Sequence, residues 1–297
     1  MKISGFTFVR NAIKFDYPIT EAILSILPIC DEVIVAVGDS EDETLQLIQS
    51  INSPKIKIIE TIWDDSLREG GKVLAVETNK ALAAIAPDSD WAFYIQGDEV
   101  VHEKYLPIIK QALQDNKDNP KIDGLLFHYL HFFGSYQHIA DSRQWYRHEI
   151  RVIRNKKNIV SYRDAQGFRT IDNKKLVVKP IEAYIYHYGW VREPFKQQKR
   201  AEINTKYWEG AKWQEKESEE KPFDYYNSVD SLALFEGSPP KVMEQRIASM
   251  NWKFEPDLTK KNLSLKNRFH HWVERTFGFR LAEYKNYRIY KKSSCKF

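Results

Sequence analysis

The first hundred residues alternate short runs of β-branched and aromatic residues with segments whose apolar positions recur at helical spacing. The runs predict strands at Lys2–Val9, Glu32–Val37, Lys55–Thr61 and Trp91–Ile95. The segments between and after them predict helices at Ile19–Leu27, Leu45–Ile51, Leu74–Ile85 and Tyr105–Leu113. Strands that alternate with helices predict a mostly parallel sheet covered by helices on both faces, so the expected fold class is α/β. Such a sheet binds its ligand beyond the carboxyl ends of its strands.

The pattern changes after about residue 120, where strand-like runs follow one another in an antiparallel or mixed region. Further strands are expected at Gly124–Phe133, His148–Arg154 and Leu176–His187, and a helix at Phe195–Trp213. Glu215–Lys221 is a charge run typical of a solvated helix end, and a turn cluster at 237–240 marks the best internal boundary. We therefore expect an α/β half at 1–120, a second half of the same domain at 121–240, and a basic, mainly helical extension at 241–297.

Charge is distributed unevenly along a chain whose totals nearly balance. Lys and Arg number 45 and Asp and Glu 41, yet residues 241–297 hold 14 of the former and 5 of the latter. A basic tail indicates either an anionic partner surface, such as lipid head groups, or a solvated terminal segment. The tail forms no recognisable nucleic-acid module, so nucleic acid is not an expected partner.

Cysteine usage and missing motifs narrow the class of protein. Cys30 and Cys295 lie at opposite ends of the chain, which excludes a disulfide framework and favours a cytoplasmic protein. No apolar run reaches the roughly 18 residues of a transmembrane helix. No glycine-rich phosphate loop follows the first strand, which weighs against dinucleotide oxidoreductases and P-loop NTPases.

An acidic turn ends the fourth predicted strand and is the most informative candidate site. Trp91–Ile95 leads directly into Gln96, Gly97, Asp98 and Glu99. A carboxylate at this edge of the sheet could hold a divalent cation that bridges phosphate oxygens. The same carboxylate could instead only cap the helix that follows.

Together with three other segments, this turn resembles the Asp-x-Asp motif of family 2 glycosyltransferases, which have the A-type, Rossmann-like fold. Arg10–Asn11 is similar to the end of that family's first strand, and Asp39–Ser40 to its nucleotide-contacting loop. His187–Trp190 is similar to the segment that returns a histidine to the metal. The resemblance covers roughly residues 1–195. It implies metal-assisted, inverting transfer of a sugar from a nucleotide-sugar donor to an acceptor hydroxyl, with the donor held by the half at 1–120.

The resemblance also implies roles for particular residues. The donor would be contacted by Arg10, Asn11, Asp39, Gln96 and Asp98, and Mn²⁺ or Mg²⁺ would be held by Asp98 and His187. Two positions depart from the family pattern. Gln96 stands where the first carboxylate of Asp-x-Asp is usual, which lowers the expected metal affinity, and Asp39 is shifted by one residue.

Transfer to a hydroxyl also requires a general base on the acceptor side, at 121–240. Asp164 resembles this base best, because it stands after a strand where related enzymes place a carboxylate. Glu149 comes second, since it could instead form an ion pair with neighbouring arginines. Arg147 and Arg151 share one face of a predicted strand, where they could grip a diphosphate or pair with acidic groups.

The acceptor and the role of the tail stay open. A glycan, a lipid-linked glycan or a protein would each offer a hydroxyl. Basic and apolar residues interleave over 260–297, so this tail could lie against the cytoplasmic face of a membrane or pack on the catalytic domain. Two alternatives remain for the whole chain: a non-catalytic scaffold that binds nucleotide sugars, suggested by Gln96, and a nucleotidyltransferase.

Overall fold

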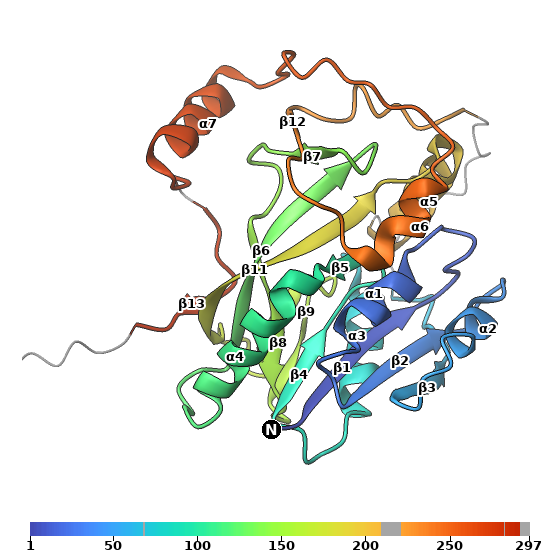
Figure 1. The fold of residues 1–297 in the computed structure, drawn as a ribbon, viewed down its shortest axis with the longest axis vertical. Helices are drawn as coiled ribbons and strands as arrows, with labels where there is room; N and C mark the ends of the chain where they lie inside the picture. The colour runs from blue at the N-terminus through green and yellow to red at the C-terminus, as the bar shows by residue number, and fades with distance from the viewer. Residues whose placement is uncertain (68, 209–220, 282, 292–297) are drawn as a thin grey trace, which may run out of the picture.

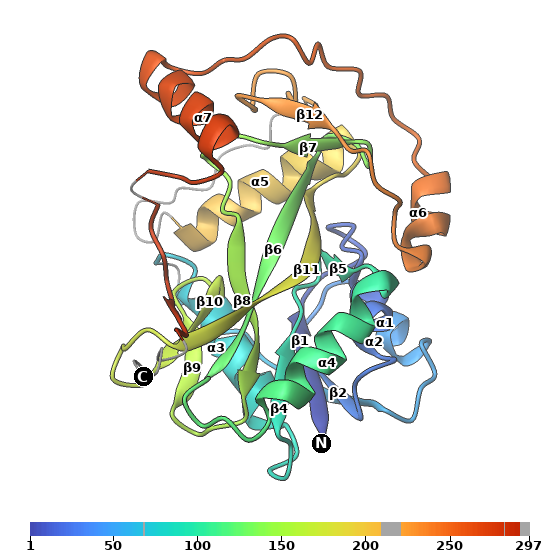
Figure 2. The same cartoon turned by 60° about the vertical axis from the view of Figure 1, so that its left-hand side comes forward.

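A large mixed sheet runs through the molecule and carries helices on both faces (Figures 1 and 2). The computed structural model describes residues 1–67, 69–208, 221–281 and 283–291, and within these ranges eleven strands form one sheet. The strand order along its main path is β12-β7-β6-β8-β4-β1-β2-β3. The α/β class expected from the sequence is confirmed.

The first half of the chain forms the parallel part of this sheet. Its strands are β1 (Ile3–Val9), β2 (Glu32–Gly38), β3 (Ile56–Thr61) and β4 (Trp91–Tyr94). Its helices are α1 (Ile19–Ile26), α2 (Thr44–Gln49), α3 (Lys72–Ala83), the 3₁₀ turn η1 (Glu103–Tyr105) and α4 (Leu106–Asn116). All pairings within the order β3-β2-β1-β4 are parallel, so the carboxyl ends of these strands meet at one edge.

Alternating side chains of these strands enter two separate cores. On one face Val33, Val35 and Phe93 pack with α1 and α4, and on the other Phe6 and Tyr94 pack with α3. This is the period of two that a strand imposes, with both faces covered. Because both faces of these strands are buried, their sequences are almost continuously apolar.

The remaining strands extend the sheet and run in both directions. They are β5 (Glu99–Val101), β6 (Gly124–Phe133), β7 (His138–Ala140), β8 (His148–Arg154), β11 (Val177–Trp190), β12 (Leu232–Leu234) and β13 (Arg288–Ile289). β8 lies antiparallel between β4 and β6, while β11 runs parallel to β6 and antiparallel to β5. A separate hairpin is formed by β9 (Ile159–Tyr162) and β10 (Gly167–Thr170).

Regular structure after β11 is mainly helical, and from residue 241 onward this agrees with the helical extension expected from the sequence. It comprises α5 (Pro194–Trp208), the 3₁₀ turn η3 (Lys241–Met243), α6 (Glu244–Ala248) and α7 (Leu265–Phe277). The predicted helix at 195–213 is confirmed as far as residue 208; its remainder and the charge run at 215–220 lie outside the described residues. In Figure 1, α7 stands at the upper left, away from the central sheet. Among the described helices, none has the length and apolarity needed to cross a membrane.

Candidate functional site

A cavity of about 490 Å³ opens beyond the carboxyl ends of β1 and β4. Its lining includes six of the residues singled out in the sequence: Arg10, Asn11, Gln96, Asp98, Asp164 and His187. Asp39 is not among the lining residues, and Glu149 lines a second cavity instead. Aromatic walls with a few convergent polar groups are typical of small-molecule sites. Here the aromatic walls include Trp63, Tyr146, Trp190, Tyr207 and Trp208.

The β1 side of the cavity is held by hydrogen bonds between loops. The Arg10 guanidinium donates to the carbonyl and to the carboxylate of Asp39 at 3.0 and 3.1 Å, and it lies over the Trp63 ring. Asp39 also accepts from the backbone N–H of Trp63 at 3.2 Å. Asn11, in the left-handed region at φ 55°, accepts from the Glu41 N–H at 2.7 Å. Asp39 therefore ties the loops together, while Arg10 and Asn11 face the cavity.

In the turn after β4, adjacent carboxylates serve different purposes. Glu99 is fully buried and accepts two bonds from Arg151, at 2.8 and 2.7 Å, and one from the Tyr129 hydroxyl at 2.7 Å. It also accepts from the Gln96 N–H at 3.1 Å. Glu99 thus fixes the shape of the turn, and Arg151 is committed to a buried ion pair rather than to a diphosphate.

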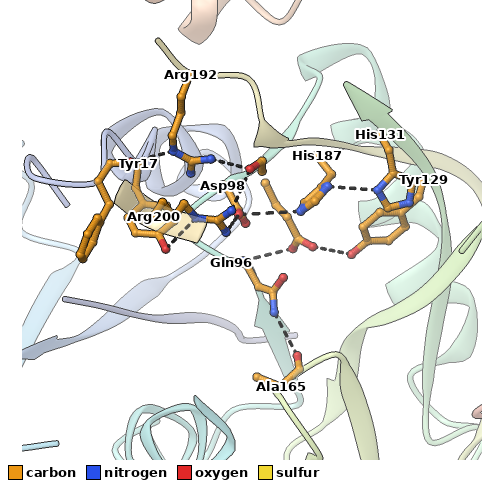
Figure 3. Close-up of polar contacts among 12 residues, drawn as sticks. Tyr17, Gln96, Asp98, Tyr129, His131, Ala165, His187, Arg192 and Arg200 are labelled. Atoms are coloured by element: carbon orange, nitrogen blue, oxygen red, sulfur yellow. Dashed lines mark hydrogen bonds and ion pairs between the residues drawn. The ribbon is translucent and has the colours of Figure 1, made fainter. Parts of the chain in front are cut away.

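Asp98 lies between Arg200 and His187 at the cavity wall (Figure 3). Its Oδ2 is 3.3 Å from Arg200 Nη2 and 3.8 Å from His187 Nε2, and the side chain is buried. β11 brings His187 here, because the Tyr188 N–H donates to the Asp98 carbonyl at 2.7 Å. Burial by itself would raise the pKa of Asp98, but the charge that His187 carries when it is protonated and the permanent charge of Arg200 outweigh burial and hold the pKa below its ordinary value.

A second histidine fixes the orientation of His187. His131 Nε2 lies 2.7 Å from the Tyr146 carbonyl, which only accepts, so this nitrogen carries the proton. In neutral His131, Nδ1 is then an acceptor, and His187 Nδ1 must donate to it across 3.0 Å. Burial lowers the pKa of both rings, which favours the neutral forms. His187 Nε2 is left with a free lone pair that faces Asp98.

These two atoms fit a divalent cation as a partial ligand set. A carboxylate oxygen, which suits Mg²⁺ and Mn²⁺, faces an imidazole lone pair, which suits a transition-metal ion and not Mg²⁺. The space beside them exists because residue 189 is glycine: a Cβ there would lie 2.6 Å from the His187 ring and 2.9 Å from Asp98 Oδ2. Among the described residues, no three His, Cys, Asp or Glu side chains converge, so a bound ion would need ligands from a diphosphate. Gln96 lines the same cavity, and its Nε2 donates to the Ala165 carbonyl at 3.1 Å.

Two arginines that the sequence analysis missed stand behind Asp98. Arg200, on α5, donates to the Gly189 carbonyl at 3.0 Å and to the Tyr17 hydroxyl at 3.2 Å. Arg192 is fully buried, and its Nη2 has no partner within the described residues. Burial and the neighbouring Arg200 lower the pKa of Arg192 to about 10. Two guanidiniums against one carboxylate leave a net positive charge. The sequence signal that could have indicated these arginines is the density of basic residues in the helix that follows His187.

Asp164 lines the same cavity, on a turn of unusual conformation. Its neighbours Arg163 and Ala165 have φ values of 55° and 63°, in the left-handed region. The carboxylate Oδ1 is buried without a partner among the described residues, and burial raises the pKa of Asp164. Gly71 makes the room, since a Cβ there would lie 2.6 Å from the Cβ of Asp164. A carboxylate that keeps one oxygen without a partner at a cavity wall is suited to accept a proton.

Comparisons with known proteins give similarity to solved structures only. No protein-family model matches the chain, and no curated protein matches it either. Residues 1–349 of S. aureus TarS are a similar solved structure, with 15% identity and a TM-score of 0.40. The similarity covers 69% of this chain and 64% of that chain. The same part of TarS has also been solved in complex with UDP. The chain therefore spans less than two thirds of that structure.

Two further similar structures have different activities in their names. Glucosyl-3-phosphoglycerate synthase from Mycobacterium tuberculosis, in complex with Mg²⁺ and UDP, matches at 19% identity over 44% of this chain and 43% of that chain, with a TM-score of 0.31. A 4-diphosphocytidyl-2C-methyl-D-erythritol synthase from Anaerococcus prevotii matches at 12% identity over 63% of this chain and 89% of that chain, with a TM-score of 0.37. Similarity at this level leaves the chemistry to be judged from the site itself.

Proposed function

We propose that the protein is a glycosyltransferase that moves a sugar from a nucleotide-sugar donor to an acceptor hydroxyl with inversion. One observation carries the proposal: Asp98, His187 and a pair of arginines meet at the end of β4, and Asp164, whose Oδ1 has no partner among the described residues, lines the same cavity. One cavity therefore holds groups that neutralise a leaving diphosphate and a group that can deprotonate a nucleophile. Transfer by direct displacement needs both.

The donor would lie along the carboxyl edge of the parallel strands. Trp63 and Arg10 offer a stacked surface for the base, and Asn11 a polar contact nearby. Arg200, supported by Arg192, supplies positive charge for the diphosphate oxygens. A divalent cation held by Asp98 and His187 would add to that neutralisation when bound.

On the acceptor side Asp164 would take the proton from the attacking hydroxyl. Its environment disfavours a buried charge, which makes the carboxylate more basic than an ordinary Asp. The hydroxyl oxygen would then attack the anomeric carbon as the bond to the diphosphate breaks, and the electron pair of that bond would leave on the diphosphate. Attack from the face opposite the leaving group inverts the anomeric configuration.

Release of nucleoside diphosphate from a panel of nucleotide sugars, with and without Mn²⁺, tests this proposal. We expect slow hydrolysis without acceptor and faster release when the correct acceptor is present. A non-catalytic scaffold would bind the same compounds without turnover. A nucleotidyltransferase would instead consume a nucleoside triphosphate and release pyrophosphate.

We also propose that α7 contacts an anionic membrane surface where lipid-linked acceptors are found. Leu265, Phe269 and Trp272 are 84%, 56% and 56% exposed and share one side of the helix, which we call the apolar face of α7. Glu274, about half a turn round from Leu265, pairs with Arg280 at 2.7 Å and with Arg147 at 3.4 Å. These pairs support an orientation in which the apolar face points away from the sheet. Such a helix with flanking basic residues is suited to a lipid interface.

A further inference from the structure

A second cavity, of about 290 Å³, lies beside the main one. Its walls come from residues 143–149, leading into β8, and from Arg280 and residues 283–287 of the tail segment. Pairing of β13 with β11 holds that segment against the sheet. Tyr146 and Gln166 line both cavities, so the second cavity adjoins the site that contains Asp164.

Residues that line this cavity carry an unusual number of unsatisfied polar atoms. Within the described part of the chain, five such buried atoms have no hydrogen-bond partner: Arg143 Nη1, Trp145 Nε1, His148 Nδ1, Glu149 Oε2 and Asn286 Nδ2. Buried polar groups are nearly always paired, and each unpaired one costs about 1–3 kcal/mol. Three of the five, on Arg143, Trp145 and Asn286, can only donate. The set is suited to a ligand rich in acceptor oxygens.

Two of these atoms converge over a glycine. A Cβ on Gly167 would lie 3.0 Å from Glu149 Oε2 and 3.1 Å from Asn286 Nδ2, so the absence of a side chain keeps that space open. Glu149 and Asn286 are only 5% and 3% exposed. Asn286 is held in place by its other amide atom, because its Oδ1 accepts from Arg169 Nε at 2.8 Å.

The charges around the cavity also favour a ligand rich in acceptor oxygens. Arg147 pairs with Glu283 and Arg280 with Glu274, so these arginines are neutralised. Arg143 has no carboxylate partner among the described residues and donates only to the Leu281 carbonyl, at 2.6 Å. Arg143 is therefore an arginine of this cavity that has no ion-pair partner among the described residues.

We propose that this second cavity binds an oxyanion, a phosphate or carboxylate group carried by the acceptor, and so makes the enzyme selective for anionic acceptors. Arg143, Asn286 and the indole N–H of Trp145 would donate to its oxygens. Burial also raises the pKa of Glu149 to about 8, so near neutral pH this group is mostly protonated and adds a further donor. The proposal rests on the proposed function for its ligand, but the cavity itself can be tested separately.

Calorimetric titration of the full chain with inorganic phosphate, glycerol phosphate and glucuronate, with glucose as the neutral probe, tests this inference. We expect the anions to bind and glucose to bind at least tenfold more weakly. Arg143→Gln should weaken anion binding at least tenfold, and Asn286→Asp, which keeps the acceptor for Arg169 and replaces the unpartnered donor, should abolish it. Arg268→Gln, which removes an exposed arginine on α7, is the matched control and should change nothing.

UDP distinguishes this inference from the proposed function. Titrating UDP in the same variants should give unchanged affinity, and UDP should not displace phosphate. Displacement by UDP would assign the phosphate to the main cavity and overturn the inference. Unaltered phosphate affinity in both variants, whose folding is checked by thermal melting, would also overturn it. Failure of UDP to bind at all would overturn the proposed function and leave the anion titrations to decide the second cavity.

Discussion

The Asp98 carboxylate has two neighbours in the cavity, Arg200 and His187. It offsets Arg200 and faces the lone pair of His187. Asp98→Asn keeps the size and removes the charge, so we expect kcat to fall about 100- to 1,000-fold, equivalent to about 2.7–4 kcal/mol of transition-state stabilisation. Metal-free UDP should bind the variant at least as tightly, since the arginines lose their counter-charge. Wild-type turnover of the variant in Mn²⁺, measured under single-turnover conditions, would remove Asp98 from the site.

Asp164 is expected to act on the acceptor alone. Asp164→Asn should abolish transfer while leaving UDP affinity within about twofold, because the base does not contact the leaving group. The raised pKa of Asp164 has a consequence for the wild type: the active carboxylate is lost, as pH falls, at a higher pH than for an ordinary Asp. The acid limb of the profile of kcat/KM against pH measures this raised pKa. If Glu149→Gln is inactive and Asp164→Asn is not, the base has been misassigned.

Glu149 makes the protein less stable as pH rises, whereas most carboxylates have the opposite effect. Its native pKa of about 8 exceeds the ordinary value of 4.5, so the native state holds more protons than the unfolded state between these values. The free energy of unfolding therefore falls as pH rises from about 4.5 to 8, by an amount on the order of a few kcal/mol. Glu149→Gln should remove this slope, as seen by urea denaturation at several pH values. An unchanged slope would contradict the burial of an ionisable Glu149.

At the scale of elements, the parallel pairing of β6 and β11 sets His131 opposite His187. His131→Phe would leave His187 Nδ1 without its acceptor and free the ring to turn. Loss of such a supporting contact typically weakens metal binding about 10- to 100-fold. Mn²⁺ affinity in the presence of UDP, read by electron paramagnetic resonance, should fall by this factor, while metal-free UDP affinity stays constant. Unaltered Mn²⁺ affinity would show that His187 is not a ligand.

The secondary-structure elements also show which parts of the fold could be predicted from the sequence. The apolar runs of β2 and β6 were predictable, because burial on both faces leaves a continuous signal. The three-residue strands β7 and β12 lack that signal, and they form only by pairing with their partner strands. The turn after β4 was found, but not that Glu99 would be committed to Arg151 while Asp98 faced the cavity. Arg192 and Arg200 were missed, since their approach depends on where α5 packs.

At the scale of the whole molecule, α7 is the feature that the domain core does not explain. Replacing Phe269 and Trp272 by Ser together should reduce sedimentation with anionic vesicles at least tenfold, because both rings belong to the exposed apolar face of α7. Phe195→Ser, which removes an exposed ring from α5, is the matched control. Binding should weaken as salt increases, since Lys and Arg near an anionic surface contribute about 1 kcal/mol each. Wild-type protein that stays in the supernatant at low salt would contradict membrane contact.

The central claim is that the cavity at the end of β4 binds the diphosphate of a nucleotide sugar. Thermal unfolding with nucleoside diphosphates and nucleotide sugars, with and without Mn²⁺, tests it most directly. A ligand at 100 times its Kd adds about 2.7 kcal/mol, which for a chain of this size raises the Tm by several degrees. We predict such a shift for at least one nucleoside diphosphate and its sugar conjugate, and a much smaller shift in Arg200→Gln. No shift with any of these compounds, or an equal shift in the Arg200 variant, would contradict the account.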